Sequence, residues 1–459
     1  MIQTHSISPE RLVELHEAER LANAGRLGDA ETLCRRVRDA EPEAPEPAAL
    51  LGFLALRHNR FEEACAQLEW AVTRRGDVPQ WRLELRQAYR SLYRLEDALR
   101  EAQAAVRLAP TEARYLHGLS QVHLDRGEWD EAMNCVLDAL ALAPDDTDVR
   151  LSLMHLLLSR GEYRPGWAAY EHRFHAKLYA RVMPAFKRPV WNGMRLPGRR
   201  LVLAADQGYG DAFQFARYIP MAAERCAGVV VLCRPTQIPV FQRIPGVVAC
   251  VTDITRAGEH AAYGWLASMP FVFGTELHAV PAATPYLSPD PARKAFWRAE
   301  LDARIARPGL RVGLVWAGNP ENGSDWRRSI RLAQLRDLAA VGVNLVSLQL
   351  PVPEADRPDM AAMGLPDLAP DLKDFGETAA VLANLDLLIG VDTGTVHLAG
   401  AMGVPTWVLT YQPADWRWLI GRDDSPWYPS IRLFRQPTAG DWADPIGRVG
   451  SALQALARA

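Results

Sequence analysis

Alanines and prolines in the first third of the chain recur at a fixed interval. Ala64, Ala98 and Ala132 stand 34 residues apart, and the prolines that end two of the segments keep the same step. Between them the apolar positions follow helical spacing, as in "YRLEDALREAQAAVRLAP" and "GEWDEAMNCVLDALALAP". Small alanines allow paired helices to approach, and proline ends a unit because it cannot continue the helix. The pattern predicts roughly four helix pairs over residues 10–145, and "GEYRPGWAAYEHRF" reads as a degenerate capping unit.

After these repeats the pattern changes to short apolar runs separated by helix-like segments. The runs that read as strands are "RLVLAAD", "GVVVLC", "GVVACVT", "LRVGLVWAG", "VNLVSLQL", "LDLLIGVD" and "PTWVLT". Nearly continuous apolar strands followed by helices are typical of parallel sheets that are covered on both faces. A charged, proline-bearing stretch at 288–309 separates the third run from the fourth. We therefore expect three domains: a helical array with its capping helices at 1–188, an α/β half at 189–305 and a second α/β half at 306–459.

The bulk composition narrows the class of protein. The chain has 459 residues, 49% of them hydrophobic, and a net charge of only −3, which argues against a polyanion-binding or disordered protein. We therefore expect no nucleic-acid partner. The six cysteines show no CxxC spacing, and the N-terminus has no basic-then-apolar leader pattern, so we expect reduced thiols and a cytoplasmic location. No uncharged apolar run is long enough to predict a membrane span.

The most informative segment is "LDLLIGVDTGTVHLAGAMGVPTWVL" at 385–409. If its apolar run is a strand and a helix follows, the turn at Asp392 lies at the carboxyl end of the strand, where open α/β sheets bind ligands. Thr393 then stands at the helix N-cap, and Gly394 lets a ligand approach the backbone. The helix N-terminus favours a phosphate, to which His397, one turn on, could also donate. Alternatively, Asp392 and Thr393 only cap a helix and His397 is a surface histidine.

A similar turn stands earlier, in "LVLAADQGYGDAFQFARYIP". Two glycines one residue apart, Gly208 and Gly210, permit a tight turn after the strand. Asp211 falls in the first helical turn, where the helix dipole stabilises its ionised form. Such a carboxylate could accept a proton from an incoming hydroxyl, or it could be an ordinary N-terminal helix acid. The segment is not a dinucleotide fingerprint, because the third glycine of GxGxxG is missing.

Together these segments resemble known families. "DLKDFGETAAVLANLDLLIGVDTGTVHLAGAMGVPTWVL" is similar to the nucleotide-sugar motif of the bacterial heptosyltransferases, glycosyltransferase family nine, and "GYGDAFQFARYIP" is similar to their N-terminal glycine-Asp motif. The whole order resembles bacterial tetratricopeptide-repeat proteins that carry such a domain, and "GLVWAGNPENGSDWRRSI" and "DWRWLIGRDDSPWYPSIRLFRQ" also fit them. The resemblance implies an α plus α/β fold: a tetratricopeptide-repeat α-solenoid followed by a GT-B-like pair of Rossmann-type α/β halves.

The resemblance also implies roles for single residues. Asp211 stands where the heptosyltransferases place their catalytic base. The turn beside it comprises Gln207, Gly208 and Gly210. The implied donor-binding residues are Asp392, Thr393, Gly394, Thr395, His397, Arg328, Gln349, Trp316 and Asn319. Arg328 would neutralise donor phosphate charge, with Arg327 as the alternative because only register separates them. Asp415, Trp416 and Arg417 lie beyond a predicted strand end and could shape the same pocket, although tryptophans 416, 418 and 427 could equally be core.

The implied function is an inverting, metal-independent glycosyltransferase that moves a sugar from a nucleotide sugar to a protein hydroxyl, while the repeat array docks the acceptor. Proteins of this organisation make flagellin the suggested acceptor. We expect no cofactor and no metal, since no DxD-type acidic pair stands in a suitable loop. Two alternatives stay open: a transferase that builds lipopolysaccharide or lipid-linked glycans, and a non-catalytic repeat scaffold or chaperone with a vestigial donor site.

Overall fold

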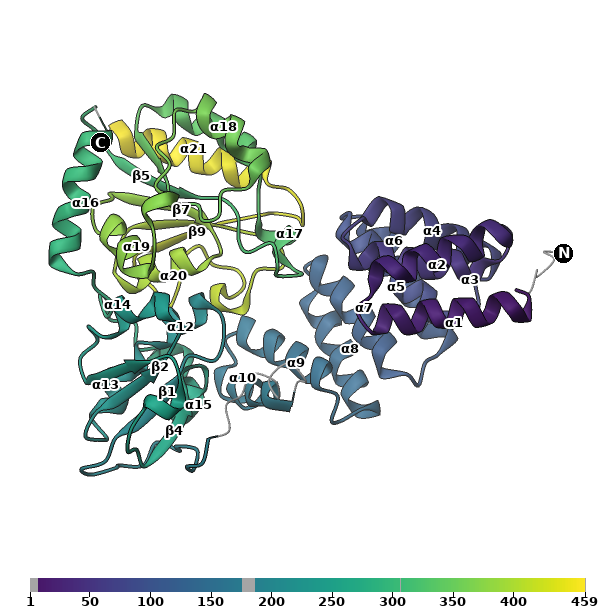
Figure 1. The fold of residues 1–459 in the computed structure, drawn as a ribbon, viewed down its shortest axis with the longest axis horizontal. Coiled ribbons are helices and arrows are strands. Elements are labelled where there is room, and N and C mark those ends of the chain that lie inside the picture. The colour runs from purple at the N-terminus through teal and green to yellow at the C-terminus, as the bar shows by residue number, and fades with distance from the viewer. Residues whose placement is uncertain (1–6, 176–185, 306, 459) are drawn as a thin grey trace. The chain divides into compact units, whose positions relative to one another are not determined.

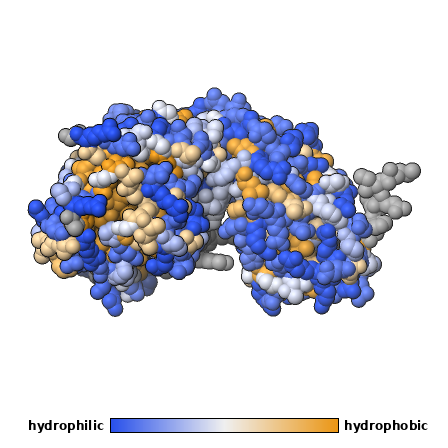
Figure 2. Space-filling view, turned by 90° about the horizontal axis from the view of Figure 1, so that it is seen from above, coloured by the Kyte–Doolittle hydropathy of each residue, from blue (hydrophilic) through white to orange (hydrophobic). Residues whose placement is uncertain are grey.

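The computed structural model describes residues 7–175, 186–305 and 307–458 and divides the chain into two compact units. Unit 1 comprises Met1–Leu153 and unit 2 comprises Met154–Ala459. Within the described ranges, no helix combines the length and the apolar character needed to cross a membrane. In Figure 2 hydrophilic side chains cover most of the surface in view, and hydrophobic residues come to the surface among them.

Unit 1 is an array of antiparallel helix pairs (Figure 1). The helices are α1 Pro9–Asn23, α2 Leu27–Ala40, α3 Pro45–Arg57, α4 Phe61–Arg74, α5 Pro79–Ser91, α6 Leu95–Leu108, α7 Ala113–Asp125, α8 Trp129–Leu142 and the beginning of α9 Thr147–Ser159. The alanines that recur along the sequence are fully buried where paired helices cross: Ala64 in α4, Ala98 in α6 and Ala132 in α8. The predicted helix pairs are therefore confirmed, and the repeat supplies their close contacts.

Unit 2 contains two parallel sheets. The first has the order β3-β2-β1-β4 and the second the order β6-β5-β7-β8-β9. The strands are β1 Leu201–Ala204, β2 Val229–Leu232, β3 Val247–Val251, β4 Ala262–Trp265, β5 Arg311–Val315, β6 Asn344–Ser347, β7 Leu387–Val391, β8 Thr406–Thr410 and β9 Ile431–Arg435. The helices around them are α10 Tyr163–Tyr170, α12 Tyr209–Phe215, α13 Tyr218–Ala223, α14 Ile238–Phe241, α15 Met269–Val272, α16 Pro291–Arg304, α17 Asp325–Arg328, α18 Arg357–Ala362, α19 Phe375–Leu382, α20 Gly394–Ala401 and α21 Ala443–Arg458. The predicted α/β fold of two parallel sheets is confirmed.

Strand β7 shows why its sequence is apolar throughout. Successive side chains of a strand point to opposite faces of the sheet. Leu387 and Ile389 pack in one cluster with residues of α21, and Leu388 packs in a second cluster with residues of α19 and α20. Figure 1 shows α21 and α20 on the two sides of this sheet. Both faces of β7 are therefore buried, and its carboxyl end carries the turn at Asp392.

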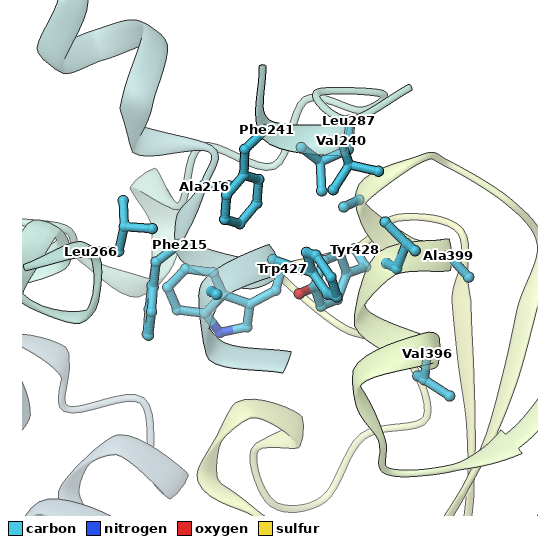
Figure 3. Packing of buried hydrophobic residues seen from close by; sticks show 14 of the residues in the cluster. Phe215, Ala216, Val240, Phe241, Leu266, Leu287, Val396, Ala399, Trp427 and Tyr428 are labelled. Carbon is cyan, nitrogen blue, oxygen red and sulfur yellow. The ribbon is translucent and has the colours of Figure 1, made fainter. Parts of the chain in front are cut away.

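The core of unit 2 is continuous from one α/β half to the other. Figure 3 shows Phe215 of the first half beside Trp427 of the second, with their ring centroids 6.3 Å apart. The guanidinium of Arg217 is buried between the halves and donates to the backbone carbonyl of Trp427 over 2.8 Å. The two sheets are thus held together by shared aromatic packing and by a buried arginine.

Helix α10 packs into this core. The indole of Trp167 contacts the rings of Phe215 and Trp416, with centroid distances of 6.3 and 5.2 Å, and its Nε1 donates to the carbonyl of Thr275. Unit 1 therefore ends at Leu153, whereas we expected the helical domain to extend to residue 188. The difference arises because the predicted capping unit "GEYRPGWAAYEHRF" is rich in aromatic residues, which α10 buries against the α/β halves.

Candidate functional site

The two glycine turns singled out in the sequence meet each other in unit 2. A Cβ atom added at Gly210 would lie 2.6 Å from Cδ2 of His397, and one added at Gly394 would lie 3.0 Å from Cβ of Tyr209. The first turns of α12 and α20 therefore touch almost without side chains between them. Gly394, which we expected to let a ligand approach the backbone, also lets Tyr209 approach in the structure. The contact brings Asp211 and Asp392 to the same place.

A cavity of about 1000 Å³ lies at this contact, and all of its lining residues belong to unit 2. It is at the upper end of the range of small-molecule sites. The predicted site residues that line it are Gln207, Gly208, Gly210, Asp211, Asn319, Arg328, Asp392, Thr393, Gly394, Thr395 and His397. The carboxyl ends of β1, β5 and β7 thus converge on one cavity, as expected for parallel α/β sheets.

Two predicted donor-binding residues, Trp316 and Gln349, do not line this cavity. Trp316 follows β5 directly and is fully buried in the core on the far face of the sheet, where its Nε1 donates to Asp356. The side-chain oxygen of Gln349 accepts the backbone N–H groups of Trp316 and Ala317. Side chains alternate along extended backbone, so the neighbours of these two residues face the cavity instead. Trp316 and Gln349 support the end of the sheet.

The carboxylate of Asp211 is held at both oxygens. Its Oδ2 accepts the backbone N–H of Gly208 over 3.1 Å, and its Oδ1 accepts a hydrogen bond from Nη2 of Arg417. Arg417 also donates from Nη1 to Asp415 over 2.7 Å and from Nε to Gln214 over 2.6 Å. Burial alone would lower the pKa of Arg417, but the charges of Asp211 and Asp415 raise it well above its usual value. Asp211 is therefore oriented by a permanently charged guanidinium.

The carboxylate of Asp392 is held in the same way by the second half. Its Oδ2 accepts the Nε1–H of Trp418 over 2.9 Å, and its Oδ1 lies 3.2 Å from Nε2 of His397. Burial would raise the pKa of Asp392, but the hydrogen bonds from His397 and Trp418 and the charge of Arg417 lower it to about 2. Arg417 and Trp418 are consecutive, so one short segment, Trp416–Trp418, anchors both aspartates.

The histidine of the second motif is buried rather than exposed. His397 is 4% exposed, its Nδ1 lies 2.9 Å from the hydroxyl of Tyr428, and its ring stacks on Trp418 with a centroid distance of 5.3 Å. The alternative of a surface histidine is therefore wrong. Both ring nitrogens already have partners, so His397 could donate to a donor phosphate only by exchanging Asp392 or Tyr428 for it.

Arg328 is the arginine of the "WRR" pair that lines the cavity. It donates from Nη1 to the backbone carbonyl of Asp392 over 3.0 Å and from Nε to Asp325 over 2.8 Å. Arg327 is not among the lining residues, and its guanidinium lies 5.0 Å from the ring of Trp326. Thr393 occupies the N-cap position of α20 without a side-chain cap bond, and within the described chain its buried Oγ1 has no partner. Arg328 and Thr393 therefore present polar groups where the second motif faces the cavity.

Other lining residues were not predicted as site residues from the sequence. They include Arg234, Lys373, Asn322, Tyr209, Tyr170 and His155. Lys373 stands in the "DLKDFGETAA" segment, and Tyr170 comes from α10, where it accepts a hydrogen bond from Gln207 over 2.7 Å. Arg234 and Lys373 add positive charge beside Arg328. Among the described residues, no group of three or more His, Cys, Asp or Glu side chains is arranged to hold a metal ion.

Two segments of the chain match models of known protein families. Residues 17–185 match a tetratricopeptide-repeat family model, and residues 354–415 match the model of glycosyltransferase family 9 (heptosyltransferase). The second match contains Asp392 and His397, whereas Asp211 lies outside it. The likeness to glycosyltransferases thus rests on the donor-side half.

One curated relative is Protein FlbA of Caulobacter vibrioides. It is 31% identical over an alignment of 386 positions that covers 77% of this chain and 63% of that protein. The match therefore spans less than two thirds of the relative's length.

Solved structures match part of the chain. A thermophilic TPR protein of Thermus thermophilus is 27% identical over 38% of this chain and 95% of that chain, with a TM-score of 0.35. The pilF protein of Pseudomonas aeruginosa is 17% identical over 38% of this chain and 78% of that chain, with a TM-score of 0.33.

Proposed function

Because the chain joins tetratricopeptide repeats to a glycosyltransferase family 9 domain, we propose that it transfers a sugar from a nucleotide sugar to a hydroxyl group of an acceptor protein. In this proposal unit 2 binds the donor and carries out the transfer, and the repeats of unit 1 dock the acceptor, with flagellin as the candidate. The observation that carries the proposal is the cavity in which Asp211 of one half and Arg328, Asp392 and His397 of the other come together.

Asp211 has the position and the chemistry of a general base. Its carboxylate takes the proton of the acceptor hydroxyl while the hydroxyl oxygen forms a bond to the anomeric carbon of the sugar. The bond between that carbon and the donor phosphate oxygen breaks, and the nucleotide leaves with the electron pair. One displacement of this kind inverts the anomeric centre. Arg417 and the N–H of Gly208 fix the orientation of the Asp211 carboxylate. The side chain of Asp211 therefore does not have to lose rotational freedom during the reaction.

The other half supplies groups that stabilise the leaving nucleotide. Arg328, Arg234 and Lys373 line the cavity, and the N-terminus of α20 opens toward it at Thr393. Preorganised cations and a helix N-terminus stabilise developing phosphate charge, and they do so without a metal ion. Metal independence is therefore part of the proposal.

Donor binding is tested first with the full-length protein. A thermal-shift panel of UDP, GDP, ADP, CMP and their common sugar conjugates in EDTA should show one nucleotide that raises the melting temperature, since a ligand that binds only the native state stabilises it. If no compound shifts the folded protein at millimolar concentration, the donor site is vestigial. A shift that appears only when magnesium is added would refute metal independence.

The role of Asp211 is tested with Asp211→Asn, which keeps the size of the side chain. We expect transfer, or slow donor hydrolysis in the absence of acceptor, to fall about 100-fold or more, because general-base catalysis contributes about 10²–10⁴-fold. The donor-induced thermal shift should stay. Asp290→Asn is the matched control, because Asp290 also accepts N–H groups at a helix N-terminus, that of α16, and does not line the cavity. Wild-type turnover in Asp211→Asn would remove the catalytic assignment.

A further inference from the structure

A second cavity, of about 440 Å³, lies entirely in unit 1. Its walls are three helices that are each the first of a pair, α1, α3 and α5. The lining positions share one face of each helix, because they recur three or four residues apart. Those positions are Leu12, Leu15, His16, Glu19, Ala22 and Asn23 in α1, Glu46, Ala49, Leu50 and Phe53 in α3, and Gln80, Trp81 and Glu84 in α5, together with Arg75. We call this surface the α1–α3–α5 groove.

The floor of the groove is apolar. Leu15, Ala49 and Leu50 are buried, and Phe53 and Trp81 are half-buried beside them. These side chains leave room for an apolar side chain of a ligand, whose burial is favourable at about 25 cal/mol per Å² of area removed from water. A segment of polypeptide with apolar residues would therefore gain from lying along this floor.

The groove is also acidic. Three glutamates, Glu19, Glu46 and Glu84, line it, against one arginine, Arg75, and one histidine, His16. Arg75 is paired with one of these glutamates, since its Nη1 donates to Oε1 of Glu46 over 2.5 Å. The second oxygen of Glu46, Oε2, is buried and accepts no hydrogen bond within the described residues. The groove therefore has more carboxylate acceptors than its own cations satisfy.

Glu84 has the least favourable surroundings of the three. Its carboxylate accepts a hydrogen bond from Nε2 of Gln80 over 2.9 Å. Burial raises the pKa of Glu84 to about 7, with a smaller contribution from the charge of Glu19 and against the hydrogen bond from Gln80, which lowers this pKa. Ionised Glu84 thus carries a desolvation cost, and a cation placed between Glu84 and Glu19 would relieve it.

We propose that the α1–α3–α5 groove docks a segment of the acceptor protein that carries a lysine or arginine flanked by apolar residues. Two properties of the groove identify this segment. Its carboxylates bind a cation, and its apolar floor binds aliphatic or aromatic residues on either side of that cation. An acidic or phosphorylated segment would meet three carboxylates and is excluded by the same argument. The inference rests on the proposed function where it identifies the partner as the acceptor protein. The chemistry of the docked segment is argued from unit 1 alone.

The test uses full-length protein and three fluorescein-labelled nonapeptides. One has a central lysine between leucines, and the other two replace that lysine with norleucine or with glutamate. Fluorescence anisotropy should give at least tenfold tighter binding of the lysine peptide than of the glutamate peptide, and the difference should shrink at 0.5 M salt. Equal binding of all three peptides, or tighter binding of the glutamate peptide, would overturn the proposal.

Variants then place the binding in the groove. Glu84→Gln and Glu19→Gln should each weaken binding of the lysine peptide about fivefold or more, while Glu62→Gln should leave it unchanged, because Glu62 is exposed on α4 outside the groove. Circular dichroism shows whether each variant keeps its helices. If Glu62→Gln weakens binding as much as Glu84→Gln, the site is elsewhere on the surface and the proposal fails.

The result can be separated from the proposed function. Donor-induced thermal shifts should be the same in Glu84→Gln and in the wild type, since Glu84 does not line the cavity of unit 2. Lysine-peptide binding without any donor binding would keep the groove and reject the transferase. Donor turnover without a preference for the lysine peptide would keep the transferase and reject the groove.

Discussion

Replacing Gly210 by alanine tests how tightly the two glycine turns of unit 2 are fitted together. The added Cβ would lie 2.6 Å from Cδ2 of His397, closer than non-bonded carbon atoms approach. His397 cannot move away easily, because its nitrogens are held by Asp392 and Tyr428 and its ring stacks on Trp418. The substitution therefore has to separate α12 from α20.

The expected cost can be bounded from general values. Forcing an extra methyl group into a close-packed contact costs about 1–3 kcal/mol. Alanine gains up to about 1 kcal/mol over glycine in a helix interior, but less at Gly210, which lies in the first turn of α12. We expect a net loss of about 1–2 kcal/mol in the free energy of unfolding of unit 2, and we expect donor turnover to fall as well because Asp211 lies on the displaced helix.

Urea unfolding followed by tryptophan fluorescence measures this loss, since most of the tryptophans belong to unit 2. The matched control is Gly447→Ala in α21, where an added Cβ has nothing within 4 Å and the helix continues on both sides. That variant should gain up to about 1 kcal/mol. If Gly210→Ala is as stable as the wild type and shows unchanged turnover, the tight contact between the two turns does not exist.

Two further predictions concern buried charges. In unit 1, Arg90 and Asp125 form a buried ion pair at 2.5 Å. Asp125→Ala should therefore lower the free energy of unfolding by about 3–5 kcal/mol and speed hydrogen exchange in α5 and α7. The double variant with Arg90→Met should recover part of this loss of stability. No recovery would mean that the charge left behind is not the source of the cost. In unit 2, the lowered pKa of Asp392 means that its ionised form stabilises the fold at pH values above its unfolded pKa, and that this stabilisation is lost as the pH falls below about 4. Stability measured between pH 6 and pH 3 should therefore fall less in Asp392→Asn than in the wild type, and parallel curves would contradict the assignment.

The sequence predicted seven of the strands and missed β4 and β9. Both missed strands lie at the edge of a sheet. Strand β9, "IRLFR", contains two arginines, and β4, "AYGW", contains a glycine and a tyrosine. The edge position alone is not the reason, because the edge strands β3 and β6 were predicted from their apolar runs. A search for continuous apolar runs passes over strands that are interrupted by charged residues or by glycine.

Most of the residues chosen from the sequence line one cavity of unit 2, because they stand at the carboxyl ends of strands that converge there. Trp316 and Gln349 were also at strand ends, yet they point to the other face. A shift of one residue reverses the face of an extended chain, and the pattern of apolar residues becomes too sparse beyond a strand end to fix that register.

What the sequence could not give is the pairing of distant residues that holds the site. Arg417 and Trp418 lie far from Asp211 in the chain, and neither belongs to a regular strand or an α-helix. The sequence placed Asp415, Trp416 and Arg417 beyond a strand end, where they could shape the pocket, and all three line the cavity, but it did not show which residues they bind. In the structure Arg417 binds Asp211 and Trp418 binds Asp392. Because Arg417 and Trp418 are consecutive, a single peptide unit places the two aspartates relative to each other. Because the hydrogen bond between Arg417 and Asp211 joins the two α/β halves, the segment after β8 fixes Asp211 relative to Asp392. A substitution at Trp418 should therefore shift Asp211 without touching it.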